Sequence, residues 1–99
     1  MPDGDYPVCV RPSSIAGMGV FTTAFVSRGT VIAPARIGVM RTPAGRYTNH
    51  SLEPNAKMVM RDGGNIDLVA IRDIQADVEI TTNYRDTARL GKAHANESL

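Results

Sequence analysis

The sequence is poor in aromatic residues and in cysteine. It has no Trp, three Tyr and two Phe among 99 residues, so a hydrophobic core must be built mainly from Val, Ile, Leu and Met. A chain of this length buries only about 60–70% of its unfolded surface, which limits it to one modest core. The single cysteine, Cys9, cannot form a disulfide within the chain, and we expect a reducing, intracellular environment.

Other absences exclude further classes of protein. With two His and one Cys, the chain offers too few ligands for a structural zinc site, and no metal is expected. No apolar run approaches the ~20 residues that span a bilayer. The acidic segment 1–5 is unlike a signal peptide. Eleven basic and ten acidic residues give a formal net charge of +1, which provides no direct signal for nucleic acid or a membrane as the main partner.

Glycine and proline interrupt the chain too often for long helices, and no helical periodicity is present before residue 85. Short strands separated by turn residues at regular intervals predict a mostly β domain. The stretches rich in β-branched residues lie at 7–11, 20–23, 30–33, 57–60, 66–71 and 79–82. Asp62-Gly63-Gly64-Asn65 predicts a hairpin turn, because Gly and Asn readily adopt positive φ. Residues 85–95 are expected to form a short helix or a loose tail.

Three separated segments carry glycine-rich or polar patterns. The first, 15–21, contains Gly17-Met18-Gly19, where glycines allow a ligand to approach the backbone closely. The second, 46–56, contains Asn49-His50-Ser51 and then Pro54-Asn55, and the third ends at Tyr84 in Glu-Ile-Thr-Thr-Asn-Tyr. Taken singly, each has a simpler interpretation. The first could be a tight turn, the second a loop whose side chains cap backbone groups, and the third a strand pair with an edge Tyr.

Taken together and in this order, the segments resemble the SET-domain family of protein methyltransferases. That family has a Gly-x-Gly-Val-Phe element, then Arg-Phe-x-Asn-His-Ser-Cys-x-Pro-Asn, and finally Glu-Leu-x-x-x-Tyr after a hairpin. The resemblance covers about residues 7–86 and predicts a single domain, with 87–99 as a C-terminal tail. It implies a mostly β SET-domain, or β-clip, fold of short strands with a knot-like C-terminal segment, an arrangement that is rare among folds.

The resemblance also implies a function, a protein-lysine N-methyltransferase that uses S-adenosylmethionine. It implies that Gly17, Met18 and Gly19 contact the cofactor through their backbone. The Asn49 side chain would hold the methionine end of the cofactor and the His50 backbone its adenine. Tyr84 would be catalytic, lining both the lysine channel and the cofactor site. The implied partner is a protein substrate that carries a lysine, a histone or another protein.

The sequence departs from the family pattern at three places. Leu52 replaces the usual Cys, and we expect it to pack in the core. Asn83 replaces the usual Asp beside the closing Tyr. Only residues 38–45 stand where the family has a helix-containing insert, which forms one wall of the peptide groove and often supplies a second Tyr.

These departures leave other interpretations open. A SET-like binding module that has lost catalysis is the main one, and an unrelated β-clip binding domain is more remote. A shortened groove wall also leaves room for a homodimer, in which a second subunit supplies the missing surface.

Overall fold

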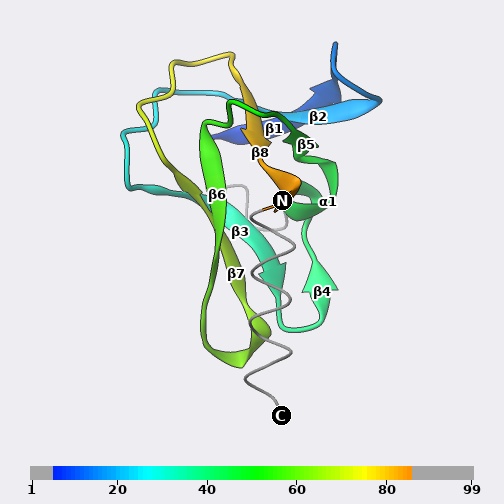
Figure 1. Cartoon of the computed structure of the whole chain (residues 1–99), viewed down its shortest axis with the longest axis vertical. Coiled ribbons are helices and arrows are strands. Elements are labelled where there is room, and N and C mark those ends of the chain that lie inside the picture. Colours follow the sequence, from blue (N-terminus) through cyan, green and yellow to red (C-terminus); the bar gives the residue numbers. More distant parts are fainter. Residues whose placement is uncertain (1–5, 86–99) are drawn as a thin grey trace.

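In the computed structural model, residues 6–85 are described, and they form two four-stranded β-sheets with one short α-helix (Figure 1). The first sheet has the strand order β1-β2-β8-β5 and the second the order β4-β3-β7-β6. The strands of the first sheet are β1 Val8–Pro12, β2 Met18–Thr22, β8 Glu79–Thr82 and β5 Asn49–His50. Those of the second are β3 Val31–Ile37, β4 Met40–Arg41, β7 Ile66–Ala70 and β6 Ala56–Met60. The predicted mostly β architecture is confirmed.

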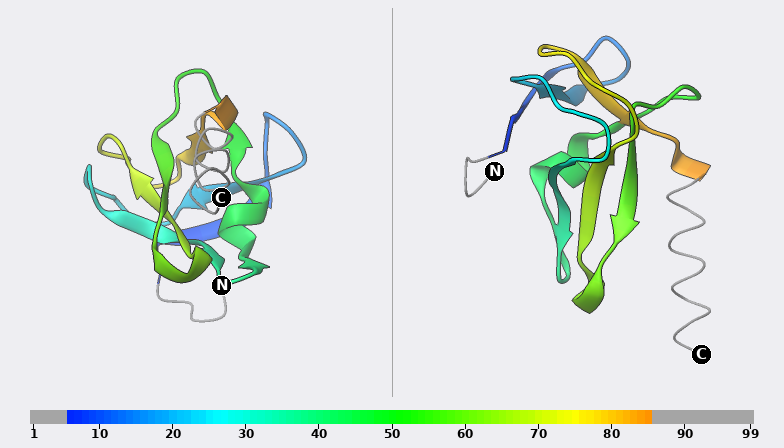
Figure 2. Two further views of the ribbon diagram at one scale, coloured as in Figure 1. Left: turned by 60° about the horizontal axis from the view of Figure 1, so that its bottom comes forward. Right: turned by 90° about the vertical axis from the view of Figure 1, so that its left-hand side faces the viewer.

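Aliphatic side chains from both sheets share one core. Its fully buried members include Val20 and Ile80 from the first sheet, and Ile32 and Leu68 from the second. Tyr47 packs against this cluster only partly buried. The two sheets are held together by small and medium aliphatic groups, as the low aromatic content predicts. Figure 2 shows how β1 and β2 lie across one end of the sheet that contains β3, β6 and β7.

The predicted hairpin turn is confirmed. Strands β6 and β7 are antiparallel partners, and the 3-10 helix η1, Asp62–Gly64, joins them. Gly63 and Gly64 have φ values of 72° and 79°, which residues other than glycine rarely adopt. The Asn65 carbonyl accepts a hydrogen bond of 2.7 Å from the Arg61 backbone N–H and closes the turn.

The expectation of no helix before residue 85 was wrong. Helix α1, Pro43–Tyr47, begins inside the segment 38–45, where the family insert was expected to be missing. Thr42 caps it by accepting a hydrogen bond of 3.1 Å from the Gly45 N–H, and Pro43 occupies the first turn. Five residues are too few to show a helical period, so only the Thr-Pro start signal was available in the sequence. The two-residue strands β4 and β5 were also missed, and the tail expected at 86–99 lies outside the described residues.

Strand β8 lies between two segments that are remote from it in sequence. It pairs antiparallel with β2 and parallel with β5. The Asn55 side chain, just beyond β5, accepts the Thr81 N–H and donates to the Glu79 carbonyl, both at 2.9 Å. The C-terminal strand is therefore flanked by the loop that follows β5, as expected for a knot-like C-terminal segment.

Substitution of Gly45 tests how α1 is seated. A Cβ at Gly45 would overlap the Ala35 carbonyl, so helix α1 must move away from β3 in a Gly45→Ala variant. We expect a loss of about 2–3 kcal/mol in the free energy of unfolding, as for overpacking of a tight contact. The control is Gly29→Ala, where a Cβ meets nothing within 4 Å but φ is +85°. It should lose only about 1 kcal/mol. Urea denaturation of both variants measures the difference in stability. An equal loss of stability would show that α1 is not packed tightly against β3.

Candidate functional site

The Asn49 side chain lies at the centre of a cluster of oxygen atoms. Its Nδ2 is 3.1 Å from both the Ala16 and the Met18 carbonyl oxygens, 3.2 Å from Ser13 Oγ and 2.9 Å from Glu79 Oε2. An amide nitrogen carries two hydrogens, so it cannot satisfy four acceptors at once. The cluster has more acceptors than donors, and this surplus favours a positively charged donor at this place.

The Gly17-Met18-Gly19 segment borders this cluster, and the two glycines are needed for different reasons. Gly17 has a φ of +45° and turns the chain into β2. At Gly19, a Cβ would collide with the Glu79 carboxylate and crowd Ser13. Both carboxylate oxygens of Glu79 lie 2.8 Å from Ser13 Oγ, which donates its single hydrogen to this carboxylate. Residue 19 must therefore be a glycine if this carboxylate is to remain beside Asn49.

The structure thus places Gly17, Met18, Gly19 and Asn49 together, as the sequence predicts. It adds Ser13 and Glu79, to which no role had been given. Glu79 stands in the closing motif and could have been noticed there. Ser13 carries no sequence signal, since it is 36 residues from Asn49 and the fold alone brings them together.

The second group of site residues joins His50 to Tyr84. His50 Nδ1 accepts a hydrogen bond of 2.9 Å from the Tyr84 backbone N–H, which requires that Nδ1 carry no proton. The two rings are in tilted contact, with centroids 4.8 Å apart. The Tyr84 hydroxyl is 3.4 Å from the Thr48 carbonyl oxygen, a weak bond, and the residue is 52% exposed. The His50 side chain, not only its backbone, therefore helps to fix the catalytic candidate.

Two of the departures from the family pattern now have a structural setting. Leu52 is 77% exposed, so the expectation that it packs in the core was wrong. It lies on the bend between β5 and β6, outside the sheets. Asn83 Oδ1 accepts a hydrogen bond of 2.9 Å from the Arg85 N–H, a local turn that an Asp side chain would make equally well.

The part of the chain that the structure describes shows neither a metal-binding cluster nor a membrane-spanning helix. Residues 6–85 hold no group of three or more His, Cys, Asp or Glu side chains arranged to bind a metal ion. No helix among them has the length and apolar character needed to cross a bilayer. Cys9 is half-buried and has a free thiol.

The bond between His50 and Tyr84 can be tested directly. His50→Phe keeps a ring beside Tyr84 but removes the acceptor. His50→Asn removes the ring but places Oδ1 as many bonds from Cα as Nδ1. A hydrogen bond worth about 0.5–1.5 kcal/mol predicts roughly two- to tenfold faster hydrogen exchange of the Tyr84 amide in the Phe variant. The Asn variant should retain the parent's rate. NMR measures the hydrogen-exchange rate of the Tyr84 amide in each variant. Equal rates in the two variants would contradict the hydrogen bond from this amide to His50.

The comparisons with known proteins agree with this geometry. The SET domain family matches residues 35–85, a segment that runs from β3 to the residue after Tyr84. The crystal structure of a "putative histone methyltransferase" from Plasmodium falciparum is similar, with a TM-score of 0.70 at 21% identity. The similarity covers 81% of this chain and 94% of that one. No curated protein matches the chain.

The fold and the family follow from these findings. The solved structure supports the fold, and the family match spans just over half of the chain, including both Asn49 and Tyr84. The segment Gly17–Gly19 precedes the matched residues, and it is tied to them through the hydrogen bonds of Asn49. The expected SET fold is therefore confirmed, and the chain belongs to the SET-domain family.

Proposed function

We propose that this protein transfers a methyl group from S-adenosylmethionine to the side-chain amine of a protein lysine. The observation that carries the proposal is the surplus of acceptors around Asn49, beside a glycine-bounded loop. The methionine end of the cofactor carries an ammonium group, which is a positively charged hydrogen-bond donor. The Ala16 and Met18 carbonyls and the Glu79 carboxylate would accept from it. The fit supports the cofactor class that SET-domain methyltransferases use.

The residues of this chain supply binding rather than acid–base chemistry. When bound, S-adenosylmethionine supplies a methyl group on a positively charged sulfonium. Gly19 leaves no side chain between β2 and Glu79, so the loop and the carboxylate stay close to Asn49. In the proposed arrangement the Asn49 amide exchanges some of its present acceptors for groups of the cofactor. Backbone contacts of Gly17, Met18 and His50 complete the proposed cofactor site.

The lysine would be oriented by Tyr84 and its surroundings. A free lysine has a pKa of about 10.4 and must lose a proton before its nitrogen can attack. The positive sulfonium and the exclusion of water both favour the neutral amine. The Tyr84 hydroxyl and the Thr48 carbonyl oxygens are 3.4 Å apart, and both can accept from the N–H groups of an amine that lies beside the pair. Tyr84 would thereby hold the nitrogen lone pair in line with the methyl group.

The substrate class is proposed as a lysine-bearing protein segment, with histones tested first. The similar protein from Plasmodium falciparum is named as a histone methyltransferase, which supports this choice for the first assay. The assay follows methyl transfer from labelled cofactor to histones and to unrelated lysine-rich proteins. Cofactor binding without transfer to any of them would favour the binding module instead.

Removal of the Asn49 amide tests the cofactor site. A hydrogen bond to a charged group contributes about 1.5–3 kcal/mol, so Asn49→Ala should bind S-adenosylmethionine at least about tenfold more weakly. Isothermal titration calorimetry measures the affinity. The matched control is Asn65→Ala in the β6–β7 turn, whose Oδ1 accepts only the Gly38 N–H, and its affinity should equal the parent's. Unchanged affinity in the Asn49 variant would remove Asn49 from the site.

Removal of the Tyr84 hydroxyl tests catalysis. The hydroxyl makes only a weak bond to Thr48, so Tyr84→Phe should lose less than about 1 kcal/mol of stability. Loss of alignment of the nucleophile by about 1 Å can reduce the rate on the order of 10²-fold. We therefore expect a folded variant with nearly normal cofactor affinity and little methyl transfer. Melting temperature, affinity and transfer rate are measured in parallel, and undiminished transfer would exclude a catalytic role.

A further inference from the structure

A second concave surface lies away from the Asn49 cluster, on the outer face of strands β6 and β7 and the loop before β3. It is a cleft of about 390 Å³. Its lining combines cationic and aliphatic side chains: Arg28, Lys57, Arg61, Val59, Val69 and Ile71. Lys57 and Val59 alternate along β6 and so face the same side of the sheet, and Arg61 follows directly after the strand. We refer to this surface as the basic cleft.

The positive charge of the basic cleft is only partly compensated. Among residues 6–85, Arg28 and Lys57 are exposed and neither forms an ion pair. Arg61 Nε is 2.9 Å from the Asp67 carboxylate, which neutralises part of its charge. The Asp73 carboxylate accepts the Arg28 backbone N–H at 2.8 Å, so it is held at the backbone and not at the guanidinium. The near-neutral charge of the whole chain therefore conceals a local excess of positive charge.

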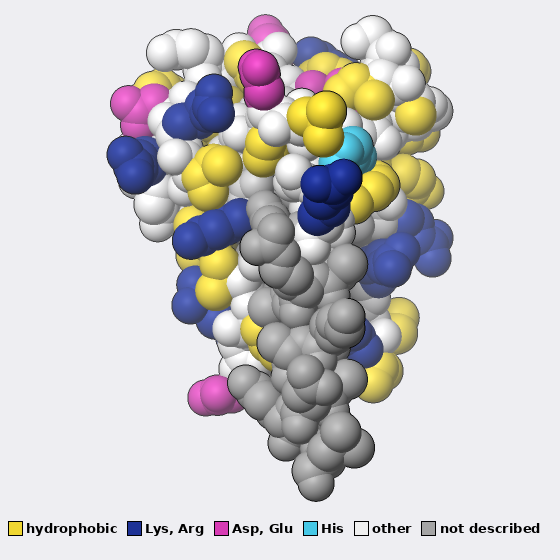
Figure 3. Space-filling model, viewed as in Figure 1, with side chains coloured by type: hydrophobic (Ala, Val, Ile, Leu, Met, Phe, Trp, Pro, Cys, Tyr) yellow, Lys and Arg dark blue, Asp and Glu magenta, His cyan; other side chains and the backbone are white. Residues whose placement is uncertain are grey.

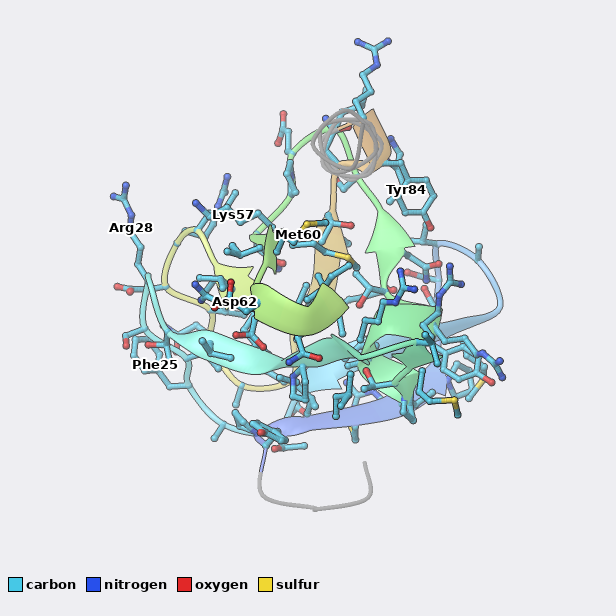
Figure 4. All side chains as sticks on the ribbon, turned by 90° about the horizontal axis from the view of Figure 1, so that it is seen from below. Phe25, Arg28, Lys57, Met60, Asp62 and Tyr84 are labelled. Carbon is cyan, nitrogen blue, oxygen red and sulfur yellow. The ribbon has the colours of Figure 1, made fainter. Side chains whose placement is uncertain are left out.

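The basic cleft is separate from the proposed methyl-transfer site. Figure 4 places Arg28 and Lys57 on the opposite side of the molecule from Tyr84. Figure 3 shows Lys and Arg side chains running down the same side as β6, interleaved with hydrophobic ones. None of the residues that line the cleft belongs to the Asn49 cluster or to the His50–Tyr84 pair. A ligand of the cleft would act independently of the cofactor.

We propose that the basic cleft binds the phosphate backbone of a nucleic acid. Lys57 lies on β6 and Arg61 just after it, so their Cα atoms are about 13 Å apart at ~3.3 Å per residue of extended chain. Cations spread over this distance can each meet a separate phosphate of a nucleic acid, which presents one about every 3.4 Å along each strand. Arg28 adds a third cation from the neighbouring loop. Two of the three are arginines, whose planar guanidinium matches the geometry of phosphate oxygens.

An acidic peptide is the competing ligand, and the surface favours it less. A flexible peptide loses conformational freedom on binding, which is offset only when pockets hold its side chains. The cleft offers shallow aliphatic contacts and exposed cations without a buried polar anchor. A stiff polyanion loses less freedom and gains the release of its condensed counterions. The binding expected here is consequently weak, independent of base sequence and strongly dependent on salt.

The test measures the affinity of the full chain for a fluorescent DNA duplex of about 20 base pairs as salt is varied. Three phosphate contacts predict a slope of about −2.7 for log affinity against log salt concentration. The affinity should therefore fall roughly 40-fold between 50 and 200 mM salt. The variant Arg28→Ala/Lys57→Ala removes the two unpaired cations. Its slope should be smaller in magnitude by about 1.8, and its affinity at 50 mM salt should be at least about tenfold lower.

The matched control removes the same amount of charge elsewhere. Arg36 and Arg41 are exposed cross-strand partners on β3 and β4, so Arg36→Ala/Arg41→Ala also lowers the net charge by two. The control should bind DNA like the parent. Equal loss in both variants, or an unchanged slope in the Arg28/Lys57 variant, would overturn the proposal. Tighter binding of a fluorescent poly-glutamate peptide than of the duplex would also overturn it. Cofactor affinity, measured alongside, should be the same in all variants, so the result does not depend on the proposed function.

Discussion

The hydrogen bonds of the Asn49 side chain tie together three parts of the chain that are far apart in sequence. Its amide reaches the carbonyls of the loop before β2 and the carboxylate at the start of β8, while its own backbone forms β5. A carboxylate that is partly removed from water needs hydrogen-bond donors, and Ser13 and Asn49 supply them. The position of Glu79 in turn requires a glycine at residue 19. The glycine loop, the central strand and the polar cluster depend on one another.

Strand β8 makes this arrangement possible because it is held on both sides. Strand β2 pairs with one side, and β5 with the loop after it covers the other. Asn55 bonds to the backbone of Glu79 and Thr81 and fixes the register of the loop against the strand. The strand therefore presents Glu79 at one end and leads to Tyr84 at the other. The proposed cofactor and lysine sites are held at a fixed separation by one short piece of backbone.

The short segment between β3 and β5 shows how little chain is needed to hold the second half of the site. Helix α1 has five residues, and Gly45 allows it to lie directly on the Ala35 backbone. The helix ends next to Thr48, whose carbonyl faces the Tyr84 hydroxyl. At the β3–β4 turn, Val39 and Met40 are 86% and 70% exposed.

The sequence by itself determined the six longer strands, the β6–β7 hairpin and the identity of the motif residues. Short stretches of β-branched residues and the Gly63-Gly64 pair act over a few residues, and local patterns of this kind can be read directly. It could not determine that Ser13 joins the site, that Leu52 is exposed, or that the His50 side chain accepts from the Tyr84 backbone. Each of these depends on which segments lie beside β8. Only the tertiary structure decided that, because pairing a strand with partners tens of residues away is set by the packing of the whole core and not by any local preference of the chain.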